Sequence, residues 1–216
     1  EAAVSANTAV AANTAKVGYT EAAVSANTAV AANTAKVGIT LDQSEAIILN
    51  TSKTQGIEFY DVGDFKQGGV VFYVDETRQH GLVCAVENQG KPKWTTEPTI
   101  TNATGTSVYA GVQNTKLMLL KDDNTVAALI CTHYVYNNTY DWYMPSIEEL
   151  EMIYDNFDII NATIQTIDGG DLLRESKFWS STEINETHAQ RMNMKDRVVS
   201  PKLKIETAYV RAIRAF

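Results

Sequence analysis

The residues that could carry out catalysis are few and scattered. The three histidines, His80, His133 and His188, lie far apart, and none has the His-x-x-x-His spacing of a zinc site. The sequence contains neither a phosphate-binding glycine loop nor a Gly-x-Ser-x-Gly turn. We therefore expect the histidines to be structural or surface residues, and we expect no enzymatic activity.

Two acidic clusters could bind calcium, which needs about six to eight oxygen ligands. Asp122, Asp123 and Asn124 form the first cluster, and Asp168 and Asp171 form the second. We interpret the first as a helix cap and the second as a turn. No metal or other cofactor is therefore expected, with calcium as the alternative.

Trp94 and Lys93 are the first candidates for ligand contact. The tryptophan stands in the polar run Lys91–Thr96, where no hydrophobic periodicity requires it. An exposed aromatic ring flanked by polar groups suits stacking on a sugar or binding a protein. The alternative is that Trp94 covers the edge of its domain or packs on a neighbouring protomer.

A second candidate loop is rich in tyrosine and asparagine, a composition typical of recognition surfaces. The residues that we expect to contact a ligand are Tyr134, Tyr136, Asn137 and Tyr140.

These candidates lie in residues 57–216, which we predict to be one domain. Tyr19 is the only aromatic residue in 1–56, so nearly all the large core-forming side chains follow position 56. Trp142, Tyr143 and Trp179 are expected in the core. Cys84 and Cys131 lie in apolar runs and are expected to be buried free thiols, with a disulfide as the alternative.

Strands near both ends of this domain, with helices between them, indicate the α+β class. The expected strands are Val70–Val74, Leu82–Val86, Phe178–Glu183 and Tyr209–Phe216. The expected helices are Gln113–Leu120, Thr125–His133 and one that begins with the capping box Ser146–Glu149.

Residues 1–40 are a 20-residue unit written twice, in which only Tyr19 and Ile39 differ. Such a repeat cannot close a core of its own, so its apolar residues must be buried by stacking or by other copies of the chain. We expect 1–56 to form a parallel trimeric coiled-coil stalk, segmented by Gly18 and Gly38. The expected seam residues are Val4, Asn7, Val10, Asn13, Val17, Val24, Asn27, Val30, Asn33, Val37, Ile47 and Asn50.

The net charge of −8 limits the possible partners. Residues 57–216 contain 15 basic and 22 acidic residues, a net charge of −7. This argues against nucleic acid and anionic membrane surfaces, and mildly against sulfated polysaccharides. No run approaches the roughly 18 apolar residues of a membrane helix, so no membrane insertion is expected.

The Val-x-x-Asn-Thr repeats resemble the stalks of trimeric autotransporter adhesins and phage-type tail fibres. This resemblance implies that the seam asparagines face a three-fold axis, where they can hold an anion. It also implies a homotrimer.

The segments GGVVFYVD, HGLV, DWYMPSIEELEMIY, INATI, FWSSTE and YVRAIRAF, in this order, resemble the Lcl C-terminal domain of collagen-like adhesins. That family is similar to C-type-lectin-like folds, in which the first and last strands pair and a Trp-Ser-Ser strand lies in the core sheet. The resemblance implies adhesion or receptor binding, with a polysaccharide as the usual ligand.

The expected protein is thus a C-type-lectin-like head on a trimeric stalk. It would be an extracellular, cell-surface or virion-exposed fibre tip that attaches to a surface polysaccharide or protein receptor. The alternative is a structural subunit of an extracellular filament or sheath, in which the head only registers the trimer.

Overall fold

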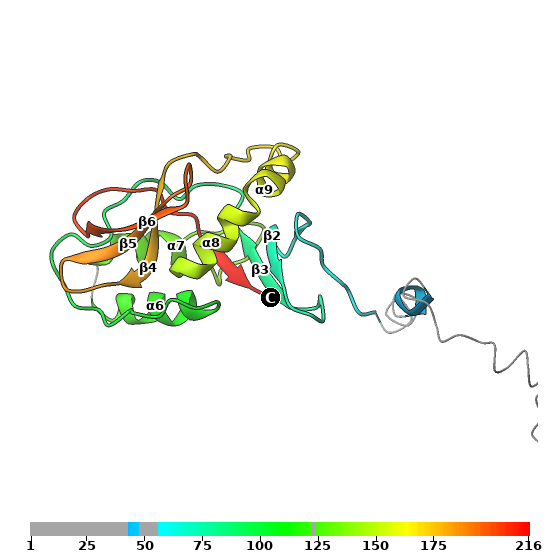
Figure 1. Cartoon of the computed structure of the whole chain (residues 1–216), viewed down its shortest axis with the longest axis horizontal. Coiled ribbons are helices and arrows are strands. Elements are labelled where there is room, and N and C mark those ends of the chain that lie inside the picture. The colour runs from blue at the N-terminus through cyan, green and yellow to red at the C-terminus, as the bar shows by residue number, and fades with distance from the viewer. Residues whose placement is uncertain (1–42, 48–55, 122–123) are drawn as a thin grey trace, which may run out of the picture. The chain divides into compact units, whose positions relative to one another are not determined.

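The computed structural model describes residues 43–47, 56–121 and 124–216, and all the strands and all but one of the helices that it describes lie in the last two ranges (Figure 1). Residues Glu58–Phe216 form one compact unit, separate from Glu1–Ile57. Residues 43–47 are helical, and Ile47 is 53% exposed in this single chain. The other predicted seam residues, and Asp122 and Asp123, lie outside the described residues.

The folded unit contains two small antiparallel sheets. The first has the strand order β1-β2-β3-β7 and the second β4-β5-β6. The first sheet comprises β1 (Phe65–Lys66), β2 (Gly69–Val74), β3 (Gly81–Cys84) and β7 (Ile213–Ala215). The second comprises β4 (Lys177–Glu183), β5 (His188–Asn193) and β6 (Val198–Leu203).

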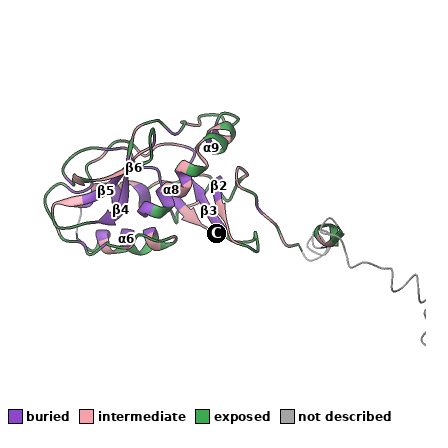
Figure 2. Cartoon of the chain, viewed as in Figure 1, coloured by how far each residue is buried: buried purple, intermediate pink, exposed green. Residues whose placement is uncertain are grey.

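Short helices complete the unit. They are α6 (Ala110–Leu119), α7 (Val126–Thr132), α8 (Ile147–Asp155) and α9 (Phe157–Ile164). Helix α8 contacts strands of both sheets, and α6 packs on β4 (Figure 1). Strands β2 and β3 of the first sheet and β4 of the second are mostly buried, whereas exposed residues line the outer sides of the helices (Figure 2).

The first sheet is buried on both faces, which explains its continuous apolar strands. Val71 and Val83 are cross-strand partners and face one core cluster, which also contains Trp94, Trp142 and Trp179. Their neighbours in the strands, Val70, Phe72, Leu82 and Cys84, face the other cluster with Leu150 and Phe178. Successive side chains of a strand point to opposite faces, so alternate residues enter different clusters.

Local signals placed several elements correctly. The Ser146–Glu149 capping box is present: the Glu149 amide donates to Ser146 Oγ at 3.3 Å, and the Ser146 amide donates to Glu149 Oε2 at 2.7 Å. Cys84 and Cys131 are both buried free thiols, so the alternative of a disulfide is wrong. Trp142, Tyr143 and Trp179 lie in the core as expected.

The expected fold class, an α+β C-type-lectin-like head preceded by a segmented coiled-coil stalk, is wrong. The final strand β7 pairs with β3 and not with the first strand, and the Trp179–Ser181 segment lies in the other sheet. The longest labelled helix in the described ranges, α6, has only 10 residues. The described chain is instead a mixed α/β fold with two small sheets.

Candidate ligand-binding pocket

A shallow pocket opens where two tight turns meet the last strand. Its volume is about 440 Å³, within the range of small-molecule sites. The β1–β2 turn contributes Gln67 and Gly68, the segment 138–141 contributes four residues, and β7 contributes Arg214. We call this the Tyr140 pocket.

The turn at residues 136–139 determines how Tyr140 is presented. The Tyr136 amide donates to the Thr139 carbonyl at 3.3 Å, and the Thr139 amide donates back at 2.9 Å. Asn137 and Asn138 between them have φ values of 47° and 60°. Positive φ at both central residues is the requirement of a type I′ turn, and asparagine tolerates it better than most residues. Just after this rigid turn, Tyr140 is left 64% exposed.

The β1–β2 turn forms the opposite wall of the pocket. Gln67 and Gly68 have φ values of 54° and 81°, again at the two central positions of a tight hairpin. A Cβ atom on Gly68 would lie 2.8 Å from Thr139 Oγ1. Glycine is therefore required by both backbone conformation and the close approach of the two turns.

Arg214 ties the three segments together. Its Nε and Nη2 atoms donate to Asp141 Oδ1 and Oδ2 at 2.6 and 2.9 Å, and its Nη1 donates to the Gln67 carbonyl at 2.7 Å. The arginine side chain is only 14% exposed, whereas that of Asp141 is 61% exposed. Partial burial raises the pKa of Asp141, but the hydrogen bond and charge of Arg214 outweigh this and hold the pKa below its ordinary value. The pair is thus ionised at neutral pH.

Tyr134 and Tyr136 do not line the pocket but belong to the same segment as Tyr140. Their rings are stacked with centroids 6.4 Å apart, and Tyr134 also meets Trp142 edge-on at 5.2 Å. The Trp142 indole N–H donates to the Thr139 carbonyl at 3.1 Å. Both tyrosines are half-buried, so they hold the turn and leave Tyr140 as the aromatic residue that lines the pocket.

The structure divides the predicted ligand-binding residues into two places. Tyr134, Tyr136, Asn137 and Tyr140 belong to one turn, with Tyr140 in the pocket and Asn137 exposed at the tip. Lys93 is exposed elsewhere, in an isolated bridge with Thr207.

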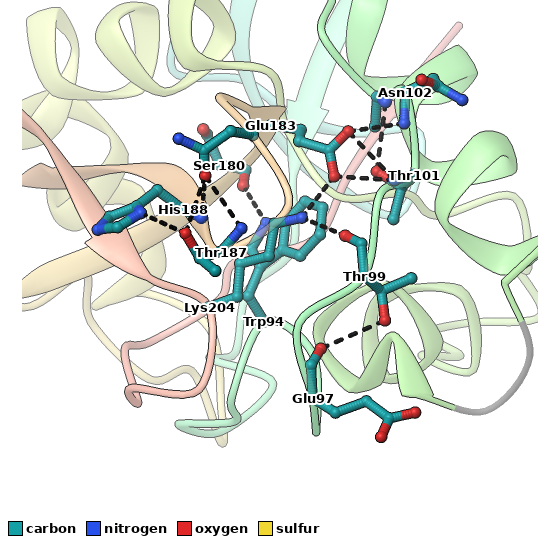
Figure 3. A network of polar contacts seen from close by, with 12 residues as sticks. Trp94, Glu97, Thr99, Thr101, Asn102, Ser180, Glu183, Thr187, His188 and Lys204 are labelled. Atoms are coloured by element: carbon teal, nitrogen blue, oxygen red, sulfur yellow. Dashed lines mark hydrogen bonds and ion pairs between the residues drawn. The ribbon is translucent and has the colours of Figure 1, made fainter.

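The prediction of an exposed Trp94 ring is wrong, because this residue is fully buried. Its indole N–H donates to the Ser180 carbonyl at 2.8 Å, and the Lys204 ammonium lies 4.5 Å from the ring centroid (Figure 3). The prediction was based on the polar residues that flank Trp94 in the sequence, and these do not determine the burial of its ring. Trp94 covers a buried charge and presents no surface to a ligand.

That buried charge is the Lys204–Glu183 ion pair, whose side chains are 0% and 2% exposed. Glu183 also accepts from the Thr101 amide at 2.8 Å and the Asn102 amide at 2.6 Å, and Lys204 donates to the Thr99 carbonyl at 2.6 Å (Figure 3). Burial raises the pKa of Glu183, but Lys204 and the two amides reverse this and lower it overall. Burial lowers the pKa of Lys204, and Glu183 opposes this only in part. The pair fastens the 94–102 segment to the second sheet.

Sequence reasoning missed the pocket-wall residues outside the predicted loop, Gln67, Gly68, Asp141 and Arg214, and within the loop it did not name Asn138 or Thr139 as ligand contacts. Asp141 and Arg214 are far apart in sequence, so no local spacing connects them. The pair Gly68-Gly69 was a usable signal, because adjacent glycines mark a tight turn.

Other candidate chemistry is limited in the described ranges. No group of three or more His, Cys, Asp or Glu side chains there could hold a metal ion. The Asp171 carboxylate pairs with Arg174 at 3.1 Å and accepts from the Asn88 amide at 2.7 Å. None of the described helices is long and apolar enough to cross a membrane.

Comparisons with known proteins give a fold and no family. No family model matches the chain, and no curated protein matches it. Among solved structures, a fimbrial protein from Bacteroides ovatus ATCC 8483 is similar, with a TM-score of 0.50 and 18% sequence identity. The match covers 62% of this chain and 35% of the fimbrial protein, so the chain spans about a third of that protein's length.

Proposed function

We propose that the chain is part of an extracellular surface appendage and that its folded unit attaches to a surface ligand, either a polysaccharide or a protein receptor. The observation that carries this proposal is the fold shared with part of a fimbrial protein. The Tyr140 pocket supplies the contact, because it combines an exposed aromatic ring with uncharged and charged polar groups on rigid turns.

Two features of the pocket support binding. First, the tight turns and the Arg214 interactions fix its walls before any ligand arrives, which reduces the entropy lost on association. Second, no hydrogen bond within the described residues engages the side-chain amide of Asn138 or the hydroxyl of Tyr140, so both groups are available to a ligand. A single shallow site of this kind binds weakly, and several copies on one appendage raise the apparent affinity by about 10²–10⁴.

The proposal is tested by counting beads coated with the full chain on epithelial cells and on immobilised mucin. Wild-type beads should attach, and Tyr140→Ala should reduce attachment strongly because the pocket loses its aromatic wall. Tyr154→Ala is the matched control: Tyr154 lies on α8 against Arg197, outside the pocket, and its loss should leave attachment unchanged. Equal attachment of wild type and Tyr140→Ala, or none by wild type, would refute the role of the pocket.

A structural subunit of a filament is the second candidate, and the tandem repeat in residues 1–40 favours it. Two nearly identical units without Leu, Phe or Trp need other copies of the chain to bury their apolar residues. Self-association is therefore part of the proposal, with a homotrimer as the expected state. Long polymers of the purified chain in electron micrographs, formed without any ligand, would favour this candidate. The lack of enzymatic activity stays a prediction.

A further inference from the structure

We infer that the Tyr140 pocket takes a neutral, hydroxyl-rich sugar unit of a surface polysaccharide, and not a carboxylated or sulfated one. This inference rests on the proposed function and specifies its ligand. It follows from the charges, the hydrogen-bonding groups and the aromatic ring that the pocket presents.

The charge of the pocket argues against an anionic ligand. Arg214 is the only cationic residue among those that line it, and Asp141 engages the guanidinium with both carboxylate oxygens. The third guanidinium nitrogen donates to the Gln67 carbonyl. An anionic sugar would therefore have to displace Asp141 and approach a domain whose net charge is −7.

A cationic ligand fits no better. Arg214 neutralises the charge of Asp141 through contacts of 2.6 and 2.9 Å to its two oxygens, and no other acidic side chain lines the pocket. The net charge of the paired side chains is zero. The pocket therefore favours neither an anionic nor a cationic ligand.

The groups that remain available are uncharged and able both to donate and to accept. The Asn138 side chain is an amide, and Tyr140 carries a hydroxyl. Sugar hydroxyls also donate and accept, so pairs of this kind are complementary in either direction. The edge of the exposed Asp141 carboxylate can accept further hydrogen bonds while it is paired, because each oxygen has two acceptor sites.

The Tyr140 ring provides the apolar part of the contact. It is 64% exposed, and it follows a turn that the backbone geometry fixes. The C–H face of a pyranose packs on such a ring, and tyrosine loses little conformational entropy when it does so. A pocket of about 440 Å³ is large enough for one sugar unit with part of the next.

The test is an array of neutral, carboxylated and sulfated glycans probed with the full wild-type chain and three variants. Wild type should bind neutral glycans only. Tyr140→Ala should lower that binding by about tenfold, and Tyr140→Phe should retain most of it because the ring remains. Circular dichroism confirms that each variant is folded.

Asp141→Asn provides a gain of function that a merely structural role would not produce. It removes the anion that occupies Arg214, so the variant should acquire binding to carboxylated or sulfated glycans that the wild type ignores. Asp141 is exposed, and its replacement leaves the Arg214–Gln67 hydrogen bond in place, so the pocket should persist.

The outcomes separate this inference from the proposed function. Wild-type binding to anionic glycans that is lost in Tyr140→Ala would overturn the inference and leave attachment through the pocket intact. Beads that attach through Tyr140 to protein receptors, with no glycan bound on the array, would do the same. Beads that do not attach at all would defeat the proposed function itself.

Discussion

Removing either member of the buried Lys204–Glu183 pair should strongly destabilise the folded unit. In Glu183→Gln, the Lys204 ammonium stays fully buried with only the Thr99 carbonyl and the Trp94 ring as partners. In Lys204→Met, the Glu183 carboxylate keeps two amide donors but loses its counter-ion. Breaking a buried pair from one side costs about 3–5 kcal/mol, which corresponds to a melting temperature lowered by about 6–20 °C in a domain of this size.

The double variant Glu183→Gln/Lys204→Met should be much less destabilised than either single variant. It contains no buried charge, and glutamine still accepts from the Thr101 and Asn102 amides. The remaining cost is that of the lost Lys204 hydrogen bonds, about 1–2 kcal/mol. The coupling free energy in this double-mutant cycle should therefore be at least about 4 kcal/mol in favour of the pair.

Urea unfolding followed by tryptophan fluorescence measures these free energies. All three tryptophans lie in residues 58–216, so the signal reports the folded unit and not the repeats. Matching transitions by circular dichroism establish two-state behaviour. Single variants that cost less than about 1 kcal/mol, as for a surface ion pair, or effects that simply add, would refute the role assigned to this pair.

Four further predictions concern pH, the pocket backbone and the thiols. Because the pKa of Glu183 is lowered in the folded state, its ionised carboxylate stabilises the fold above the ordinary pKa of 4.5. This stabilisation is lost as pH falls through the lowered pKa, so the unfolding free energy of Glu183→Gln, measured by urea titration, should depend less on acid pH than that of wild type. The pH effect of Glu149 has the opposite sign, because burial raises the pKa of this carboxyl. The free energy of unfolding should therefore fall as pH rises from 4.5 through the pKa of Glu149 in the folded state, and Glu149→Gln should remove that fall. The same pH dependence in wild type and variant would contradict a raised pKa. Gly68→Ala should lower the free energy of unfolding more than Gly90→Ala in the same assay. Both glycines have positive φ, but only at Gly68 would the added Cβ meet another residue, Thr139. Equal losses of stability would mean that the two turns are not in close contact. Burial raises the pKa of Cys84 to about 11 and that of Cys131 still further, so neither thiol should react with a disulfide reagent until urea unfolds the chain, and rapid labelling of the native protein would show that the core is open.

The parts of the fold that sequence predicts well are those whose signals are local. The apolar runs at Val70–Val74 and Leu82–Val86 became β2 and β3 because the first sheet is buried on both faces. The Ser146–Glu149 capping box needs only residues three apart in sequence, and it formed as predicted.

The parts that failed depend on contacts between distant segments. Trp94 was predicted to be exposed because its neighbours are polar, but Lys204, far along the chain, provides a charge for it to cover. Strand β6 was not predicted, because none of its residues is fully buried and it contains Pro201, which suits only an edge strand. The predicted fold class was wrong for the same reason: β7 pairs with β3, and the sequence of a single strand does not determine which strand it pairs with.

The candidate site was predictable only in part. The composition of the 134–140 loop indicated recognition, and Tyr140 does line a pocket. The Asp141–Arg214 pair that sets the charge of this pocket depends on bringing β7 to the loop. Its ligand class could therefore be argued only once the fold was known.

Hydrogen–deuterium exchange of the full chain, alone and with neutral glucan, mannan and galactan oligosaccharides, shows whether the two turns around Tyr140 form the attachment site. We expect at least one oligosaccharide to protect peptides covering 65–69 and 136–141, and Tyr140→Ala to abolish this protection. Protection confined to another surface, or equal protection in wild type and Tyr140→Ala, would contradict this expectation.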